Sequence, residues 1–165
     1  MKISLPYGNE MVGMEVPDQC FIGMIDPPEA QPAGDPERMI LDAIEHPVGG
    51  PKLEDIVTPD KRIAVIVDDG SRPTPISTIL PVLLDQLIRC GARREQIKIV
   101  IALGSHRYMT EDEMRERVGE EIYQTYPVVN SEFRDPEKLV YIGDTEEGAP
   151  LMATSSVMDA DLRIG

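Results

Sequence analysis

A strand–helix–strand pattern between residues 62 and 102 constrains the fold of this chain more than any other feature. Two apolar runs without alternation, Ile63–Val67 and Ile97–Ala102, have the composition of parallel strands that are covered on both faces. Between them, apolar residues recur at helical spacing over residues 76–88, and Gly91 follows where such a helix would end. Because a crossover helix joins strands that run in the same direction, we predict an α/β fold with a right-handed connection.

The flanking segments extend this pattern to a mixed sheet. Alternation predicts an N-terminal β segment over residues 1–27, with a short strand at residues 20–25. A Pro- and Gly-rich linker and a helix capped by Asp35 should occupy residues 28–60. Residues 61–165 should form the α/β core. The predicted fold is therefore a single α/β domain with a largely parallel, Rossmann-like sheet, crossover helices and an N-terminal β segment.

Local signals place the ends of several elements in the core. Thr74 and Pro75 suit the start of the first crossover helix, and Thr110 with Glu113 forms a capping box for another. The segment Thr145–Gly148 has turn composition and lies between two short apolar runs, so it predicts a hairpin.

The charge of the chain argues against two classes of partner. Its 16 Lys and Arg and 30 Asp and Glu give a formal net charge of −14, whereas nucleic acids and anionic membranes bind basic surfaces. No stretch approaches the ~20 apolar residues of a membrane span, and no signal-peptide pattern begins the chain. Cys20 and Cys90 are far apart and form no CxxC motif. We therefore expect reduced, mostly buried thiols in a cytoplasmic protein without a zinc site.

Polar loops follow both strands of the central pattern. The first, Asp68–Pro75, reads DDGSRPTP, and the second, Gly104–Arg107, reads GSHR. In open α/β sheets, ligands bind beyond the carboxyl ends of the strands. Arg72 offers a planar fork of donors that fits a carboxylate or phosphate, and His106 can exchange a proton at physiological pH. An anion anchor beside an acid/base residue suits proton abstraction next to a carboxylate.

The other residues of the first loop have simpler roles. Gly70 lets the backbone turn and approach a ligand closely, and Ser71 can add a hydrogen-bond donor. Of Asp68 and Asp69, we expect one to hold Arg72 in place and the other to accept bonds from ligand hydroxyls. Two alternatives stay open at this point: a surface turn that merely starts a helix, and a loop histidine without a function.

The chain resembles the N-terminal domain of nickel-dependent lactate racemases, the LarA-like family. The resemblance runs over nearly the whole sequence and is strongest over residues 47–165. It rests on two loop motifs and on later segments in the same order: DDGSRPTP, IALGSHRYMTEDE with VGEEI, DPEKLVYIGDTEEGAP and MDADLRIG.

This resemblance implies a racemase or epimerase of 2-hydroxy acids that depends on a nickel pincer nucleotide, built on a pyridinium mononucleotide. Hydride from the substrate would pass to this cofactor and return to either face. His106 would be one of two histidines that exchange the hydroxyl proton, and Arg72 would act beside it. Four residues would contact the cofactor or the substrate: Asp69, Gly70, Ser71 and Arg72.

The same resemblance implies that part of the catalytic apparatus lies outside this sequence. The family's second catalytic histidine, its cofactor-tethering lysine and its nickel-ligating histidine would follow residue 165, so we expect no metal site in the chain. The strand-like segment Asp161–Gly165 with nothing after it agrees with a missing C-terminal domain. The isolated chain should therefore be inactive, and an uncovered apolar face should favour self-association. Family members often carry histidine where this chain has Asn130.

Two functions remain open on the sequence. The first is the N-terminal catalytic half of a lactate-type racemase, acting on a small 2-hydroxy acid together with its C-terminal domain. The second is a non-catalytic α/β module that binds an anionic nucleotide or sugar phosphate. An ordinary hydrolase or kinase is disfavoured because the sequence has no GxSxG, P-loop or metal-ligand motif.

Overall fold

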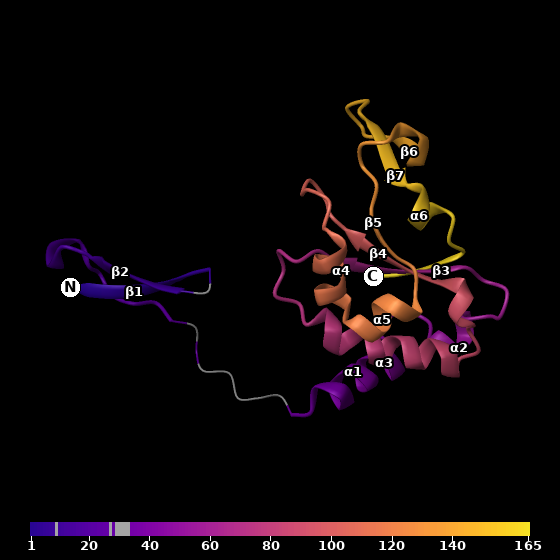
Figure 1. Ribbon diagram of the computed structural model, residues 1–165, viewed down its shortest axis with the longest axis horizontal. Helices are drawn as coiled ribbons and strands as arrows, with labels where there is room; N and C mark the ends of the chain where they lie inside the picture. Colours follow the sequence, from indigo (N-terminus) through magenta and orange to yellow (C-terminus); the bar gives the residue numbers. More distant parts are fainter. Residues whose placement is uncertain (9, 27, 29–33) are drawn as a thin grey trace. The chain divides into compact units, whose positions relative to one another are not determined.

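The computed structural model describes residues 1–8, 10–26, 28 and 34–165. It divides into two compact units, Met1–Ala33 and Gly34–Gly165, which Figure 1 shows in colours that follow the sequence. The first unit contains a β-hairpin, and the second contains the main sheet together with the α-helices of the described residues. The two units are therefore described one at a time.

The first unit is a two-stranded antiparallel hairpin. Strand β1 (Lys2–Tyr7) pairs with β2 (Glu10–Glu15), as the predicted β segment requires. Ile3 lies opposite Met14, and Leu5 lies opposite Val12. Because side chains alternate between the faces of a strand, these residues give the hairpin one apolar face. The connection between the two strands includes residue 9, which lies outside the described residues.

A predicted third strand in this unit is wrong. The 3₁₀ turn η1 (Asp18–Cys20) closes with a hydrogen bond from Cys20 N to Pro17 O at 2.8 Å, and residues 21–26 form no strand. The apolar residues at 21–25 thus have no pairing partner in the described part of the unit. Both cysteines are free, and Cys20 is exposed rather than buried as predicted, while Cys90 is half-buried. The predicted linker falls largely on residues 27 and 29–33, outside the described residues.

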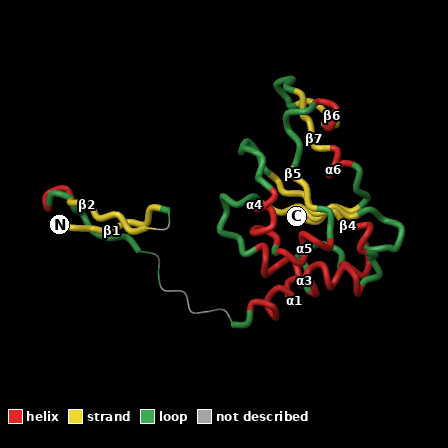
Figure 2. Tube along the Cα trace, viewed as in Figure 1, coloured by secondary structure: helices red, strands yellow, loops and turns green. Residues whose placement is uncertain are grey.

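The second unit is built on a four-stranded parallel sheet in the order β5-β4-β3-β8, with strands drawn in yellow in Figure 2. Strands β3 and β4 pair in register from Ile63 beside Ile97 to Asp68 beside Ala102. The bounds of the four strands are β3 (Ile63–Asp68), β4 (Ile97–Ala102), β5 (Val128–Asn130) and β8 (Leu162–Ile164). The predicted α/β fold with a largely parallel sheet and crossover helices is confirmed.

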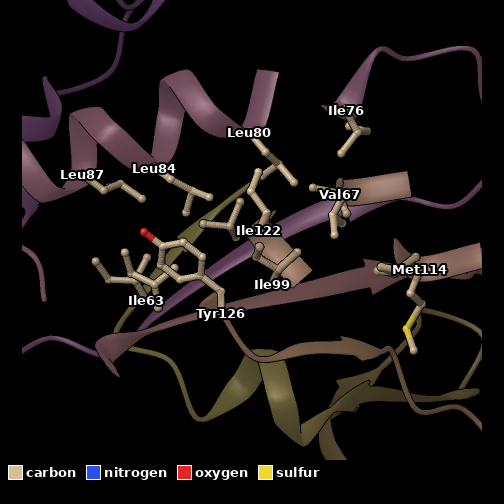
Figure 3. Packing of buried hydrophobic residues seen from close by; sticks show 14 of the residues in the cluster. Ile63, Val67, Ile76, Leu80, Leu84, Leu87, Ile99, Met114, Ile122 and Tyr126 are labelled. Atoms are coloured by element: carbon tan, nitrogen blue, oxygen red, sulfur yellow. The ribbon is translucent and has the colours of Figure 1, made fainter. Parts of the chain in front are cut away.

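One face of this sheet carries the main hydrophobic core (Figure 3). Three helices supply it: α3 (Ile76–Arg89), α4 (Glu111–Val118) and α5 (Glu120–Thr125). The apolar stripe of α3 predicted from helical spacing is buried at Ile76, Leu80, Leu84 and Leu87. It meets every second residue of the two central strands, including Ile63, Val65, Ile99 and Ile101. Each such side chain contributes roughly 1.5–3 kcal/mol on burial, so the strand ends are held on a firm support.

The opposite face of the sheet is covered less. A separate cluster of Ala64, Val100 and Ala160 lies there, and Val157 of the short helix α6 (Ser155–Met158) packs against it. From the apolar runs of β3 and β4, we predicted that other elements would cover both faces of the sheet. Within the described residues the second cluster is much the smaller of the two, and Ala102 at the end of β4 is exposed.

The remaining elements surround this layer. Helix α1 (Pro36–Glu45) packs against α3, so the helix predicted within residues 28–60 belongs to the second unit. The predicted hairpin turn at Thr145–Gly148 is confirmed. The other elements are the antiparallel strands β6 (Leu139–Asp144) and β7 (Pro150–Thr154), helix α2 (Leu53–Ile56), and the 3₁₀ turns η2 (Arg94–Gln96) and η3 (Pro136–Lys138). Among the described residues, the helices are all too short or too polar to span a membrane.

Two of the three predicted helix caps are present. Asp35 accepts a hydrogen bond from the first turn of α1, and Thr110 forms the predicted capping box at α4. Thr74 does not cap α3. Its hydroxyl donates to Asp68 Oδ2 at 2.5 Å, and Pro75 takes the position before the helix without a side-chain bond. The first polar loop therefore folds back on the end of β3 instead of leading straight into the helix.

Candidate active site

The two polar loops lie at the same edge of the sheet. Asp68 and Ala102, the last residues of β3 and β4, are paired neighbours, so the loops that follow them begin side by side. Between these loops and the starts of α3 and α4 lies an open cavity of about 680 Å³. Its polar lining includes Asp69, Ser71, Ser77, His106, Arg107 and Arg117. Residues of both loops therefore line one cavity, His106 among them, but the expectation that Arg72 faces the same crevice is not met because Arg72 is absent from its lining.

A carboxylate–imidazole pair forms the centre of the cavity. Asp69 is 7% exposed, and its Oδ2 lies 2.5 Å from Nδ1 of His106. Its other oxygen, Oδ1, accepts bonds from the Ser71 hydroxyl at 2.6 Å and from the Ser71 N–H at 3.1 Å. The bonds from Ser71, followed by that from His106, lower the pKa of Asp69 to about 2. Asp69 is therefore an anion at physiological pH.

The ionised Asp69 determines which nitrogen of the His106 ring carries the proton. A carboxylate can only accept hydrogen bonds, so Nδ1 must be the donor in this pair. In the neutral ring, Nε2 then keeps its lone pair and can accept a proton. The His106 side chain is 53% exposed and lines the cavity, so that lone pair is accessible to a ligand.

Arg72 lies apart from this pair. It is exposed, and it does not belong to the residues that line the cavity. The expectation that a neighbouring aspartate holds it in place is wrong, because Asp68 pairs with Arg117 and Asp69 pairs with His106. Gly70 and Ser71 do line the cavity, next to Asp69. Of the four residues assigned to ligand contact, three thus face the cavity and Arg72 lies beside it.

Arg117 is the residue of this site that sequence reasoning missed. It lies in the last turn of α4, lines the cavity and pairs with the Asp68 carboxylate. An arginine in the last turn of a helix has an ordinary explanation, because cations there interact favourably with the helix dipole. Only the placement of α4 beside the end of β3 reveals its partner.

The second loop has anchors of its own. Asn130 accepts a bond from Met109 N at 3.2 Å and donates to Met109 O at 2.9 Å, which ties the loop to the end of β5. Arg107 makes a two-bond pair with Glu113, at 2.6 and 2.8 Å. Asn130, where the resembling family often has histidine, thus has a structural role here. Both anchors hold the part of the chain that directly follows His106.

The cavity lining offers hydroxyls and charges of both signs, including the carboxylates of Asp69, Glu113 and Glu116. Ser71, Thr74 and Ser77 contribute hydroxyls to its lining, and the first turn of the 14-residue helix α3 opens on it. Helix starts favour anions where their N–H groups lack partners, and in α3 the N–H groups of Ile76 and Thr78 already donate to Thr74 O and Pro75 O. In the part of the chain that the structure describes, no group of three His, Cys, Asp or Glu side chains could hold a metal ion.

The depressed pKa of Asp69 predicts how acid affects stability. The folded-state pKa of about 2 lies below the ordinary value of 3.8, so the ionised carboxylate stabilises the fold above about pH 4 and loses this effect as the pH falls towards 2. We expect Asp69→Asn to lower the free energy of unfolding by about 1–3 kcal/mol at neutral pH. The difference from wild type should shrink over the acid range. Urea unfolding at several pH values measures both.

The control for this prediction is Asp60→Asn, which changes an exposed aspartate in the turn before β3. Its effect on the free energy of unfolding should be small at all pH values. An Asp69→Asn variant that is as stable as wild type at neutral pH would contradict the role given to the carboxylate.

Comparison with known proteins places the chain in a family. The family model described as the lactate racemase N-terminal domain matches residues 7–165. The chain belongs to this family. It is 31% identical to the lactate racemase of Thermoanaerobacterium thermosaccharolyticum and 28% identical to that of Lactiplantibacillus plantarum. Each match covers 98% of the chain and 38% of the relative.

A solved structure gives the same result for the fold of this lactate racemase N-terminal domain. The lactate racemase apoprotein from Thermoanaerobacterium thermosaccharolyticum matches it with a TM-score of 0.79 at 29% identity. The match covers 99% of this chain and 38% of that protein. The chain therefore spans well under half the length of the lactate racemases it resembles.

Proposed function

We propose that this chain is the proton-transferring N-terminal part of a 2-hydroxyacid racemase of the lactate type. The observation that carries the proposal is the Asp69–His106 pair, which lies on an open cavity at the carboxyl ends of two neighbouring parallel strands. Membership of the lactate racemase N-terminal domain family supports the same reaction class.

The chemistry assigned to the chain is removal and return of the substrate hydroxyl proton. His106 Nε2 takes this proton while Nδ1 stays bonded to Asp69, and the imidazolium that forms is stabilised by the adjacent carboxylate. As the C2 hydride leaves with its electron pair, the hydroxyl carbon becomes a carbonyl carbon and a 2-oxo acid results. Return of hydride to the opposite face, with a proton to oxygen, gives the other enantiomer. His106 therefore serves as base in one direction and as acid in the other.

The hydride acceptor in this proposal is the nickel pincer nucleotide. Bound to the intact protein, it would supply a site that takes up the C2 hydride and gives it back. The cavity fits the anionic, nucleotide end of such a group through its hydroxyls and the start of α3. Ser71 and Gly70 would contact it there. In this proposal, the nickel ligands and a tether for the nucleotide would come from outside this chain.

The proposal also states which partners the domain has. The proposed substrate is a small 2-hydroxy acid. The proposed structural partner is a region equivalent to the part of the related lactate racemases that this chain does not cover. The formal net charge of −14 disfavours nucleic acid and anionic membranes.

Racemisation in D₂O tests the proposed reaction. A holoenzyme that contains this chain should interconvert D- and L-lactate, and the product should carry no deuterium at C2 because the hydrogen moves as hydride. Mass spectrometry of the product after many turnovers gives the result. Extensive deuterium at C2 would instead indicate carbanion chemistry, with His106 or another base removing the C2 proton.

The alternative function is a non-catalytic module that binds a nucleotide or sugar phosphate. The start of α3 and the cavity hydroxyls are the observations in its favour. It predicts phosphate-dependent binding of a mononucleotide to the chain together with absence of racemisation by the intact protein. Racemisation that depends on His106 would exclude it.

Arg72 provides a separate prediction. As an exposed guanidinium beside the cavity, it is available to pair with the substrate carboxylate or a cofactor phosphate. Arg72→Ala should weaken binding of that anion by roughly 1.5–3 kcal/mol, or about ten- to a hundredfold. Arg72→Lys should recover little because it lacks the planar fork. The Michaelis constant for lactate and the cofactor content of the holoenzyme measure the two effects. Wild-type values for both in Arg72→Ala would contradict the assignment.

A further inference from the structure

We infer that Arg117 is a positioning residue that holds the first polar loop, and through it the His106 ring, in the geometry needed for proton transfer. The inference deepens the proposed function and rests on it. Arg117 lies in the last turn of α4, far from Asp68 along the chain, and its side chain is only 12% exposed. The hydrogen-bond partners of the Arg117 guanidinium indicate this positioning role.

The Arg117 guanidinium is bonded to both ends of the loop. At the start, Nε donates to Asp68 O at 3.1 Å, and Nη2 donates to the Asp68 carboxylate. At the end, Nη1 donates to Arg72 O at 3.2 Å and to Thr74 O at 3.0 Å. Residues 69–71 lie between these points. Because one planar group makes all four bonds, it fixes the distance between the two ends of the loop.

These bonds leave Arg117 poorly suited to binding a ligand itself. An arginine has five N–H donors, and four bonds to protein acceptors already use most of those of Arg117. The contrast is with Arg72, whose side chain is exposed beside the cavity. The two arginines therefore have different roles. Arg72 is available to bind an anion, whereas Arg117 holds the first polar loop in place.

Arg117 also balances charge at the end of β3. Asp68 and Asp69 are consecutive carboxylates, and like charges at this spacing disfavour each other. Arg117 neutralises Asp68, while the Asp68 Oδ2 accepts a bond from Thr74. Asp69 is then free to pair with His106 alone.

The loop position matters because the Asp69–His106 bond is short and directional. The two atoms lie 2.5 Å apart, and the Asp69 backbone is set by the anchored residues before and after it. A small shift of the loop would break this bond and release the ring. The proton would then be free to occupy Nε2, the nitrogen that must be empty for His106 to act as a base.

Nitrogen-15 NMR of the histidine rings tests the inference directly on the 165-residue chain. The chain has two histidines, and His46 lies exposed at the end of α1, so it serves as an internal reference. The nitrogen shifts, recorded at alkaline pH, report which ring atom carries the proton. The variants are Arg117→Met and Arg117→Lys, the second of which keeps the charge but donates from a single nitrogen.

Arg115→Lys is the matched control. Arg115 lies on the same helix and contacts Glu120 and Tyr123, but none of its hydrogen bonds reaches the first loop. We expect wild type and this control to carry the His106 proton on Nδ1. In Arg117→Met, the Nδ1–H population of His106 should fall at least twofold, with a smaller fall in Arg117→Lys, while the signals of His46 stay unchanged.

The outcomes separate this inference from the proposed function. No turnover is measured, so an intact protein that fails to racemise lactate would end the racemase proposal and leave the NMR result standing. If Arg117→Met does not fold, Arg117→Lys decides. A folded Arg117→Lys with wild-type His106 ring signals would overturn the inference, because the fork of bonds to the loop would then have no effect on the ring.

Discussion

His106→Ala should lower the turnover number of a holoenzyme that contains this chain by about 10²–10⁴, the range that a positioned acid or base contributes. Without the imidazole, the substrate hydroxyl proton loses its acceptor beside the cavity, and the Asp69 carboxylate is a poor replacement because its bonds from Ser71, which remain in the variant, lower its pKa and make it a weak base. The Michaelis constant should change less, since His106 does not anchor the substrate anion in this proposal. Initial rates from D- and L-lactate, followed by a chiral assay, give both constants.

The chain offers a matched control for this prediction. His46→Ala changes the other histidine, which is exposed at the end of α1 with its Nδ1 3.1 Å from Asp42 O. Turnover should not change in that variant. Both variants should keep the wild-type circular dichroism spectrum, because each histidine lies on the surface. Near-normal turnover in His106→Ala would make His106 an ordinary loop residue and remove the central element of the proposed function.

The sheet and its helices could be predicted because their signals are local. The helical spacing over residues 76–88 and the apolar runs of β3 and β4 depend only on neighbours in sequence, and each was found where predicted. The strand predicted at residues 20–25 failed for the opposite reason. An apolar segment becomes a strand only if another strand is available to pair with it, and the hairpin of β1 and β2 leaves it unpaired. Strand pairing depends on residues that are distant in the sequence, so local composition alone does not predict it.

The same distinction applies to the site. The two loops could be placed together because consecutive parallel strands end at one edge of a sheet. The partners within the loops could not be assigned. Asp68 and Asp69 look alike in sequence, yet one faces Arg117 and the other faces His106. Side chains alternate along a strand, so two adjacent aspartates at its end point to different neighbours, and only the placement of α4 and the second loop decides which neighbours these are.

The exposed position of the Arg72 side chain follows from the pairing of the two aspartates with other residues. Because Arg117 and His106 satisfy the two aspartates, neither holds the Arg72 side chain. An exposed guanidinium costs little while it remains hydrated, and in the proposed function it can pair with a ligand carboxylate without first breaking an internal bond. The pairing that sequence reasoning predicted would have made Arg72 less available for this task.

The 165-residue chain alone should bind no stoichiometric nickel and should not racemise lactate. Firmly held nickel needs a cluster of nitrogen, oxygen or sulfur ligands, and none of the described side chains form such a group of three. His46 and His106 lie on different segments, at the end of α1 and after β4. The proposed reaction also needs a second proton-exchanging residue and a cofactor tether from outside this chain. The chain should nevertheless fold, because the strand–helix–strand core lies wholly within it.

Elemental analysis after incubation with nickel and dialysis, combined with a chiral lactate assay, measures both parts of this prediction. The holoenzyme of the Thermoanaerobacterium relative is the positive control for the assay, and circular dichroism confirms that the chain is folded. Sedimentation of the same sample tests whether the less covered face of the sheet causes self-association. Nickel near one per chain, or racemisation above background, would place a complete catalytic apparatus within these residues. It would require a ligand set that includes side chains outside the described residues or contributed by a second copy of the chain.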